Sequence, residues 1–245
     1  MTMTGLQALY EDPATPISSG DDRTRRQARM LAEVARSSSR PLRIVDIGCG
    51  DGAATALAAR LCPGHRVLGV DWSRQALRRA RAHGIEVVQG TVDDGGLPIA
   101  DGSVDVAVFS EVIEHLVDTD AALDEIMRVL RPGGTLLLST PNLAAWFNRG
   151  LLLGGVQPVF TEVSLRGVHG RPGTEVVGHL RVFTRRAVVS LLTSRGFEVR
   201  RVSGAAYHDV PTVLRPFDRL FRLLPSAAAI LLVQAVKPMG RTDEP

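Results

Sequence analysis

Glu111, Glu114 and His115 stand close together, directly after an apolar run at residues 104–109. If this segment is helical, Glu114 and His115 lie three and four positions beyond Glu111, and the three side chains meet on one side of a turn. Carboxylates and an imidazole in this arrangement can accept a proton or hold a divalent cation. We predict that Glu111 is a catalytic group. Four histidines are candidate bases, ranked His115, then His179, with His169 and His208 behind.

A glycine-rich stretch at residues 46–52, Asp-Ile-Gly-Cys-Gly-Asp-Gly, is the second candidate for chemistry. Its glycines allow a tight turn and a close approach of the backbone to a ligand. With Ala53 the stretch also matches the GxGxxA pattern of NAD(P)-binding oxidoreductases, which are therefore an alternative. Asp46 argues against them, because its carboxylate would repel a pyrophosphate but suits a ligand that carries an ammonium and a sulfonium.

Further candidate ligand contacts follow the next two predicted strands. Asp71 comes 19 residues after Gly52, where a carboxylate can accept hydrogen bonds from both hydroxyls of a ribose. Trp72 either lies beside an adenine ring or is a core indole. Residues 92–94, Val-Asp-Asp, stand where the edge of an adenine is commonly bound.

These groups have to be positioned by alternating strands and helices. Short apolar runs predict strands at residues 42–47, 67–70, 85–88, 104–109 and 135–139. Amphipathic runs predict helices at residues 21–36, 53–61, 74–82 and 121–130. Near-continuous apolar strands that alternate with helices are typical of a parallel sheet covered on both faces.

The alternation breaks at Pro141. Residues 142–180 combine several glycines and prolines with apolar patches, and they are too long for a simple connection, so we expect a lid or binding segment. A helix at 184–195, capped by Thr184, and an antiparallel pair of strands at 197–203 and 230–236 complete the chain.

Four motifs occur in order along the chain: 45–52 (Val-Asp-Ile-Gly-Cys-Gly-Asp-Gly), 97–105 with its Leu-Pro and Asp-Gly-Ser-Val-Asp, 110–116 (Ser-Glu-Val-Ile-Glu-His-Leu) and 130–134 (Leu-Arg-Pro-Gly-Gly). Together they resemble the class I S-adenosylmethionine-dependent methyltransferases related to ubiquinone and menaquinone biosynthesis. The resemblance implies an α/β, Rossmann-like doubly wound fold with a seven-stranded, mostly parallel sheet, an antiparallel last strand and a cap. It also implies S-adenosyl-L-methionine contacts at Asp46, Gly48, Cys49, Gly50, Asp71, Trp72, Val92, Asp93 and Ser110. The chain departs from the family at Thr91 and Val92, where members often carry Asp-Ala or Asp-Leu.

The Glu-x-x-Glu-His segment, taken with His179 and residues 139–142, also resembles the small-RNA terminal 2′-O-methyltransferases, in which two glutamates and two histidines hold a divalent metal. Many small-molecule methyltransferases carry the same segment without a metal. We therefore expect no metal, and no change in activity when metal is added to the apo protein.

Composition narrows the possible partners. The net charge of +3 comes almost entirely from arginines spread along the chain, and Lys237 is the single lysine, so we expect no nucleic-acid partner. The two cysteines indicate neither a disulfide framework nor a CxxC metal site. The longest apolar stretch, residues 227–233, is far shorter than the ~20 residues that span a bilayer. We expect a soluble, cytoplasmic protein, and a homodimer is one of the oligomeric states that its composition allows.

We divide the chain into an N-terminal arm and helix (1–40), a cofactor-binding core (41–141), a substrate cap (142–180) and the C-terminal part of the core (181–245). The leading hypothesis is a methyltransferase that acts on a small molecule, with O-methylation of a secondary-metabolite-type acceptor favoured. The alternatives are a metal-dependent RNA terminal 2′-O-methyltransferase, a non-catalytic S-adenosylmethionine-binding module and, last, an NAD(P) oxidoreductase.

Overall fold

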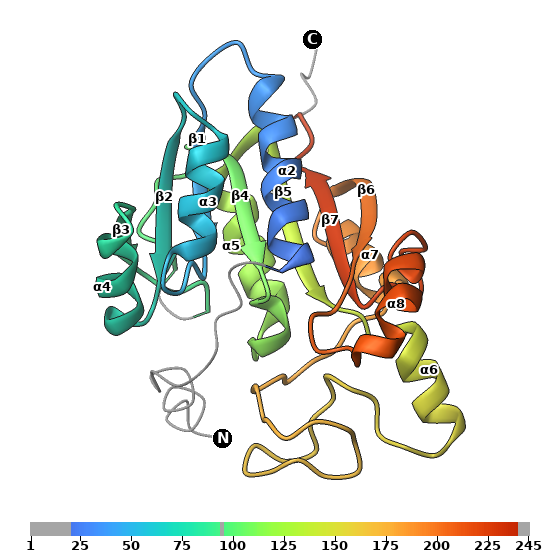
Figure 1. The fold of residues 1–245 in the computed structure, drawn as a ribbon. Helices are drawn as coiled ribbons and strands as arrows, with labels where there is room; N and C mark the ends of the chain where they lie inside the picture. The colour runs from blue at the N-terminus through green and yellow to red at the C-terminus, as the bar shows by residue number, and fades with distance from the viewer. Residues whose placement is uncertain (1–20, 94–95, 240–245) are drawn as a thin grey trace.

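The computed structural model describes residues 21–93 and 96–239, which fold around one central sheet (Figure 1). The arm predicted for residues 1–20, and Asp94, lie outside the described residues. Among the residues described, no helix is long and apolar enough to cross a membrane.

Seven strands form the sheet in the order β3-β2-β1-β4-β5-β7-β6. Strands β1 to β5 are parallel to one another, whereas β7 runs antiparallel to both β5 and β6. The predicted seven-stranded, mostly parallel sheet with an antiparallel last strand is therefore confirmed. The strands are β1 (Arg43–Ile47), β2 (Arg66–Asp71), β3 (Glu86–Gln89), β4 (Val104–Ser110), β5 (Leu130–Pro141), β6 (Glu198–Ala205) and β7 (Ile230–Val236).

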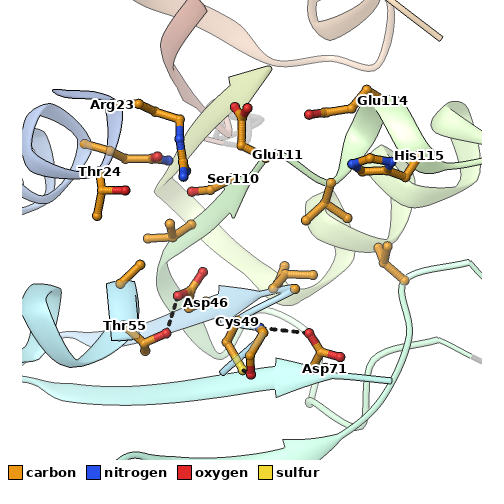
Figure 2. A pocket seen from close by; sticks show the side chains of 18 of the residues that line it. Arg23, Thr24, Asp46, Cys49, Thr55, Asp71, Ser110, Glu111, Glu114 and His115 are labelled. Carbon is orange, nitrogen blue, oxygen red and sulfur yellow. Dashed lines mark hydrogen bonds between the residues drawn. The ribbon is translucent and has the colours of Figure 1, made fainter. Parts of the chain in front are cut away.

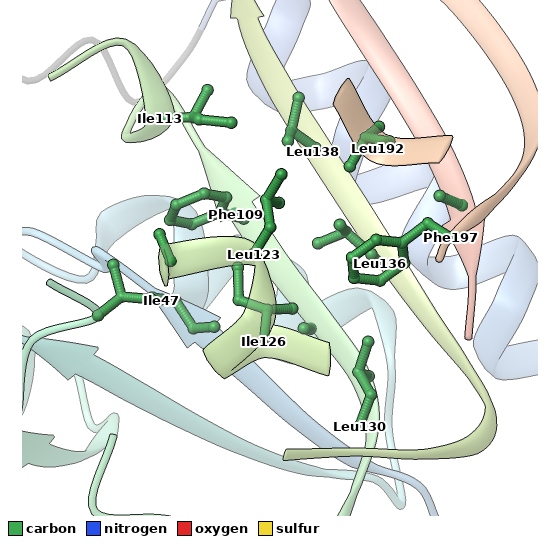
Figure 3. Packing of buried hydrophobic residues seen from close by; sticks show 14 of the residues in the cluster. Ile47, Phe109, Ile113, Leu123, Ile126, Leu130, Leu136, Leu138, Leu192 and Phe197 are labelled. Carbon is green, nitrogen blue, oxygen red and sulfur yellow. The ribbon is translucent and has the colours of Figure 1, made fainter. Parts of the chain in front are cut away.

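Helices cover both faces of the sheet because successive strand residues point to opposite sides. On one face Ile44 and Val108 pack in one cluster with Leu31 of α2. On the other face Phe109 packs in a second cluster with Leu123, as Figure 3 shows. The helices are α2 (Asp22–Arg36), α3 (Ala53–Leu61), α4 (Arg74–Ala82), α5 (Thr119–Val129), α6 (Trp146–Leu153), α7 (Arg185–Ser194) and α8 (Arg215–Phe221), with short 3₁₀ turns η1 (Ile113–His115) and η2 (Thr212–Leu214).

The start of β5 differs from the prediction. Helix α5 ends at Val129, and β5 already begins at Leu130, so residues 131–134 belong to the strand, which the apolar run predicts only from residue 135. Leu130 pairs with Val104, and the register shifts before the pairing resumes at Thr135. The irregular, glycine-containing start of the strand explains why its sequence resembles a turn.

Two helices were not predicted. Helix α6 lies inside the 142–180 segment, where the surrounding glycines and prolines suggested irregular structure. Helix α8 lies in the connection between the last two predicted strands and contains Pro216. Proline is tolerated there because the N–H groups of the first helical turn have no partner inside the helix.

Candidate active site

The glycine loop lies at the carboxyl end of β1, beside β4, where the order of strands along the sheet reverses. The N–H groups of Gly48 and Cys49 both donate to the carbonyl of Val70, at 2.8 and 3.0 Å. Gly48 has φ +78°, and a Cβ at this position would lie 2.4 Å from Cγ2 of Val112. Gly48 is therefore required both by its backbone conformation and by the space around it.

Asp46 is buried at the end of β1, and its Oδ2 accepts a hydrogen bond of 2.6 Å from the Thr55 hydroxyl. Burial raises the pKa of Asp46 to about 6, with the nearby Asp71 carboxylate acting in the same direction and the Thr55 hydroxyl opposing it. A buried carboxylate of this kind gains most from a cationic ligand. Thr55 has no signal in the sequence, because its role depends on α3 packing beside the end of β1.

Asp71 is held at the end of β2 by two backbone N–H groups. Its Oδ2 accepts from Gly50 at 2.9 Å and its Oδ1 from Ser73 at 2.8 Å. Burial raises the pKa of Asp71, although these hydrogen bonds oppose the shift. Each oxygen keeps a further lone pair for a ligand hydroxyl. Trp72 beside it is half-buried and lines the cavity, so it is not a core indole.

A single cavity of about 710 Å³ extends from the glycine loop to the Glu-x-x-Glu-His segment. Figure 2 shows Asp46 and Asp71 on one side of this cavity, with Glu111 and Glu114 on the other. The predicted cofactor contacts line it together: Asp46, Gly48, Cys49, Gly50, Asp71, Trp72, Val92, Asp93 and Ser110. His115, His179 and Glu111 line the same cavity, and His208 does as well.

Glu111 adopts a left-handed backbone conformation with φ +54°, which is rare for a residue other than glycine. Glu111 therefore precedes the helical turn, which the structure forms at Ile113–His115 as a 3₁₀ turn, and the helical arrangement considered for Glu111 does not occur. The side chains still converge, because Glu111 accepts from Ser139 at 2.8 Å while Glu114 accepts from Thr140 at 3.1 Å. Such backbone strain is concentrated at functional sites.

Glu114 is completely buried, and its Oε1 has no hydrogen-bond partner among the described residues. Burial raises the pKa of the Glu114 carboxyl, and the neighbouring Glu111 carboxylate adds to the shift. Burial also raises the pKa of Glu111, against the opposing effect of the Arg23 guanidinium. A buried carboxylate oxygen without a partner is costly, so this one is well suited to bind a ligand, a proton or a cation.

His115 and His179 meet at the edge of this group, with ring centroids 4.9 Å apart. Nδ1 of His115 lies 3.1 Å from the carbonyl of Gly178, and Nδ1 of His179 lies 2.9 Å from the carbonyl of Phe160. A carbonyl only accepts, so each Nδ1 carries the proton and each Nε2 of the neutral ring has a lone pair. Burial lowers the pKa of both histidines to about 4, which keeps the rings neutral.

Three of these side chains could hold a metal ion. Glu114, His115 and His179 offer ligand atoms that all lie within 4.8 Å of one another. Histidine ligands of metals commonly donate their second ring N–H to a carbonyl, as both histidines do here. An imidazole pair with a carboxylate fits Mn²⁺ or Fe²⁺.

Comparison with known proteins explains the residues that line the cavity. Residues 45–138 match a family model described as a methyltransferase domain. The chain contains a class I S-adenosylmethionine-dependent methyltransferase domain. The cofactor of this kind of domain is S-adenosylmethionine, as the acidic residue before the glycine loop predicted, and the NAD(P) alternative is not supported.

Curated relatives and solved structures agree with this assignment. A probable S-adenosylmethionine-dependent methyltransferase of Mycolicibacterium smegmatis is 41% identical over 101 residues, covering 40% of this chain and 38% of the relative. A ubiquinone biosynthesis O-methyltransferase of Cupriavidus pinatubonensis is 31% identical over 168 residues, covering 66% and 65%. The first three curated relatives are matched over only 30% to 38% of their own length.

Among solved structures, the fold is similar to the 1,6-didemethyltoxoflavin-N1-methyltransferase of Burkholderia thailandensis, with S-adenosylhomocysteine bound. The TM-score is 0.62 at 19% identity, covering 96% of this chain and 86% of that one. At this identity the similarity establishes the methyltransferase fold alone.

Two residues that no sequence motif marks also line the cavity. Arg23 at the start of α2 lines the cavity and lies near Glu111, as Figure 2 shows. Tyr207, in the connection after β6, packs its ring 4.9 Å from that of Phe160, and both line the cavity. His169, one of the candidate bases, is exposed and is not among the lining residues. Neither Arg23 nor Tyr207 lies in a motif, so only the packing of the chain reveals them.

Glu162 organises the end of the 142–180 segment. Its carboxylate, with only 1% of the side chain exposed, accepts hydrogen bonds from the N–H groups of Val177, Gly178 and His179 at 2.7, 2.8 and 3.1 Å. Arg171 pairs with the same carboxylate at 3.3 Å. This contact fixes both the carbonyl that orients His115 and the backbone that carries His179.

Proposed function

We propose that the chain is an S-adenosylmethionine-dependent methyltransferase of a small, partly apolar acceptor, with oxygen as the favoured accepting atom. The observation that carries this proposal is the single cavity that joins the cofactor-binding loop to the Glu111–His115 segment. A methyl donor bound over Asp46 and Asp71 would direct its sulfonium toward that segment. An acceptor would then lie between the sulfonium and the two histidines.

The chemistry asks for little beyond positioning, because the methyl group on a sulfonium is already activated. An oxygen nucleophile must lose its proton, and a neutral imidazole can receive it. We infer that Nε2 of His115, or of His179 beside it, takes up this proton. The carboxylates of Glu111 and Glu114 would stabilise the imidazolium that forms.

The acceptor side of the cavity supports a partly apolar molecule, such as a secondary-metabolite scaffold. Phe160 and Val177 line it from the 142–180 segment, Ala206 and Tyr207 from the connection after β6, and Ile230 from the start of β7. We propose that residues 142–180, together with α2, form the substrate cap over the core.

The direct test is a panel of hydroxylated, amine and carbon acceptors incubated with the methyl-labelled cofactor. Label in a small hydroxylated acceptor is the expected result. Label found only in RNA would contradict the small-molecule proposal. Binding of S-adenosylhomocysteine without transfer to any acceptor would favour a non-catalytic binding module.

A metal-assisted form of the same transfer is a second candidate, favoured by the geometry of Glu114, His115 and His179. The unpartnered Oε1 of Glu114 and the two Nε2 lone pairs fit a divalent cation. Bound there, the ion would supply Lewis-acid polarisation of an acceptor oxygen. Mn²⁺ binding to the apo protein, followed by calorimetry or by the electron paramagnetic resonance signal, tests it. Two results together would establish the metal-assisted transfer over the metal-free one. Mn²⁺ binding should be lost in His179→Ala, and activity should be lost in EDTA and restored by Mn²⁺.

A further inference from the structure

Helices α6 and α8 carry a concentration of exposed apolar side chains. Of the twelve large hydrophobic residues that are exposed among the described residues, seven belong to α6, to α8 or to the turns that flank α8. They are Leu152, Leu153, Val213, Phe217, Leu220, Leu223 and Leu224. We call this surface the α6–α8 face. Large exposed apolar patches commonly mark sites that bind a protein or a membrane.

The two helices are joined by specific contacts. The ring of Trp146 in α6 stacks on Phe221 of α8 with centroids 5.5 Å apart. The Trp146 indole N–H also donates to Asp218 at 3.0 Å, and Asp218 accepts from the backbone N–H of Tyr207 at 2.8 Å. Figure 1 shows α6 and α8 beside each other at one edge of the molecule.

The orientation of α8 is the reverse of an ordinary surface helix. Phe217 and Leu220 are three residues apart on α8 and share one side of it. Both are more than half exposed, as are Val213 in η2 before the helix and Leu224 in the turn after it. The polar Asp218 is the residue that turns inward, with 2% exposure. Helix α8 is thus held by its polar and aromatic side, while its apolar side faces outward.

The exposed charged side chains of α6 and α8 are all positive. Arg149, Arg215 and Arg219 are exposed on the same two helices. Asp218, the single acidic residue within 146–153 and 212–226, is buried and already accepts two hydrogen bonds. An exposed apolar surface with arginines and no exposed acid is the pattern of segments that lie in the interface of an anionic bilayer.

We propose that the α6–α8 face binds the surface of an anionic lipid bilayer, with Phe217, Leu220 and Leu153 entering the interface and Arg215 and Arg219 contacting the lipid head groups. A second copy of the chain fits this face less well. In a two-fold contact the same patch meets itself, so these arginines would be brought together without a carboxylate between them.

The position of the face also connects it to the cavity. Phe147 of α6 packs against Phe160 and Tyr207, with centroids 6.1 and 6.3 Å away, and both of those residues line the cavity. One layer of aromatic side chains therefore separates the lipid-facing helix from the acceptor space. This position would allow an apolar acceptor to pass from the bilayer to the cavity. That delivery rests on the proposed function, whereas lipid binding by the α6–α8 face does not.

Vesicle flotation of the full chain tests the proposal. We expect binding to vesicles of phosphatidylcholine with an equal part of phosphatidylglycerol, and at least fivefold less to phosphatidylcholine alone. Phe217→Ser with Leu220→Ser should lower binding roughly tenfold, because the apolar anchor is removed. Arg215→Gln with Arg219→Gln should lower it by a similar factor and weaken its salt dependence.

The matched controls are Leu61→Ser, for an exposed apolar residue on α3, and Arg185→Gln with Arg186→Gln on the exposed start of α7. These should bind as the unmodified chain does. No binding to anionic vesicles, or equal loss in the controls, would overturn the proposal. A dimer in light scattering that Phe217→Ser with Leu220→Ser converts to a monomer would assign the face to self-association instead. Transfer to a water-soluble acceptor, measured without vesicles, reports on the proposed function separately.

Discussion

His115 and His179 face each other with ring centroids 4.9 Å apart, and both rings are oriented by carbonyls of the 142–180 segment. His115 follows β4, in the part of the chain that carries the recognisable motifs. His179 and the carbonyl of Gly178 come from a segment outside residues 45–138, which the methyltransferase family model matches. The candidate catalytic group is therefore assembled by contact between the core and the segment above it.

Replacing His115 by alanine should lower turnover far more than cofactor affinity. Removal of a group that accepts a proton typically costs about 10²–10⁴-fold in rate. Turnover with an acceptor identified by the panel, and the Kd for S-adenosylhomocysteine measured by calorimetry, separate the two effects. His83→Ala, an exposed histidine at the end of α4, is the control. An unchanged rate in His115→Ala would remove this residue from the catalytic group.

Glu162→Gln should reduce turnover at least tenfold although Glu162 is not expected to touch the acceptor. An amide cannot accept from all three N–H groups of residues 177–179, and it leaves the buried Arg171 without its charge partner, which costs about 3 kcal/mol. The ring resonances of His115 and His179 in NMR spectra should shift as their backbone supports move. The exposed Glu175→Gln in the same segment should change neither quantity. A slower enzyme with unshifted histidine resonances would show that Glu162 acts in another way.

Cofactor affinity should depend on the protonation of Asp46. The free carboxyl titrates at about pH 6, and a cationic group of the ligand favours its ionised form. Affinity for S-adenosylhomocysteine, which keeps the ammonium, should therefore fall by up to about tenfold per pH unit below pH 6 and be constant above pH 7. Calorimetry between pH 5 and 8 measures this. Asp46→Asn should bind S-adenosylhomocysteine more weakly at pH 7.5, and its affinity should not depend on pH. If the affinity of Asp46→Asn still fell below pH 6, the pH dependence would belong to another group.

The same substitution should make the empty protein more stable. The carboxyl of Asp46 has a pKa of about 6 in the folded chain, against 3.8 for an exposed aspartate, so between these pH values the folded state binds more protons than the unfolded state. The free energy of unfolding therefore decreases as the pH rises through this window. A two-unit shift corresponds to about 3 kcal/mol. At pH 8 Asp46→Asn should unfold at higher urea concentration than the unmodified chain, and this advantage should shrink at pH 5.

Gly48→Ala should destabilise the fold and abolish cofactor binding. The new Cβ would lie 2.4 Å from Cγ2 of Val112 at φ +78°, so strain and overlap together should cost about 2–4 kcal/mol. Gly64→Ala is a matched control, because Gly64 has φ +81° but nothing within 4 Å of the added Cβ. It should cost only about 1 kcal/mol. Urea unfolding measures both, and equal losses would show that the overlap with Val112 is relieved without cost.

The sequence alone determined the parts of this protein that depend on local chemistry. Successive side chains of β1 and β4 point to opposite faces of the sheet and pack in different core clusters. Because both faces are buried, the two strands appear in the sequence as nearly continuous apolar runs. The glycine loop, Asp46 and Asp71 predicted the cofactor. The glycines of the loop and the acidic residues at the ends of the two neighbouring strands follow one another at a spacing that can be read from the sequence. Local patterns did not reveal α8, since its apolar side faces outward and Pro216 stands in its first turn.

The tertiary structure decided how the acceptor side of the cavity is built. Arg23, Glu162 and Tyr207 have no neighbours in sequence that mark them, and each reaches the cavity or its histidines through contacts with distant segments. Glu111 and Glu114 converge through hydrogen bonds to Ser139 and Thr140 on β5, not through a shared helix. Hydrogen bonds between distant residues depend on how the whole chain packs, and sequence spacing carries no information about that.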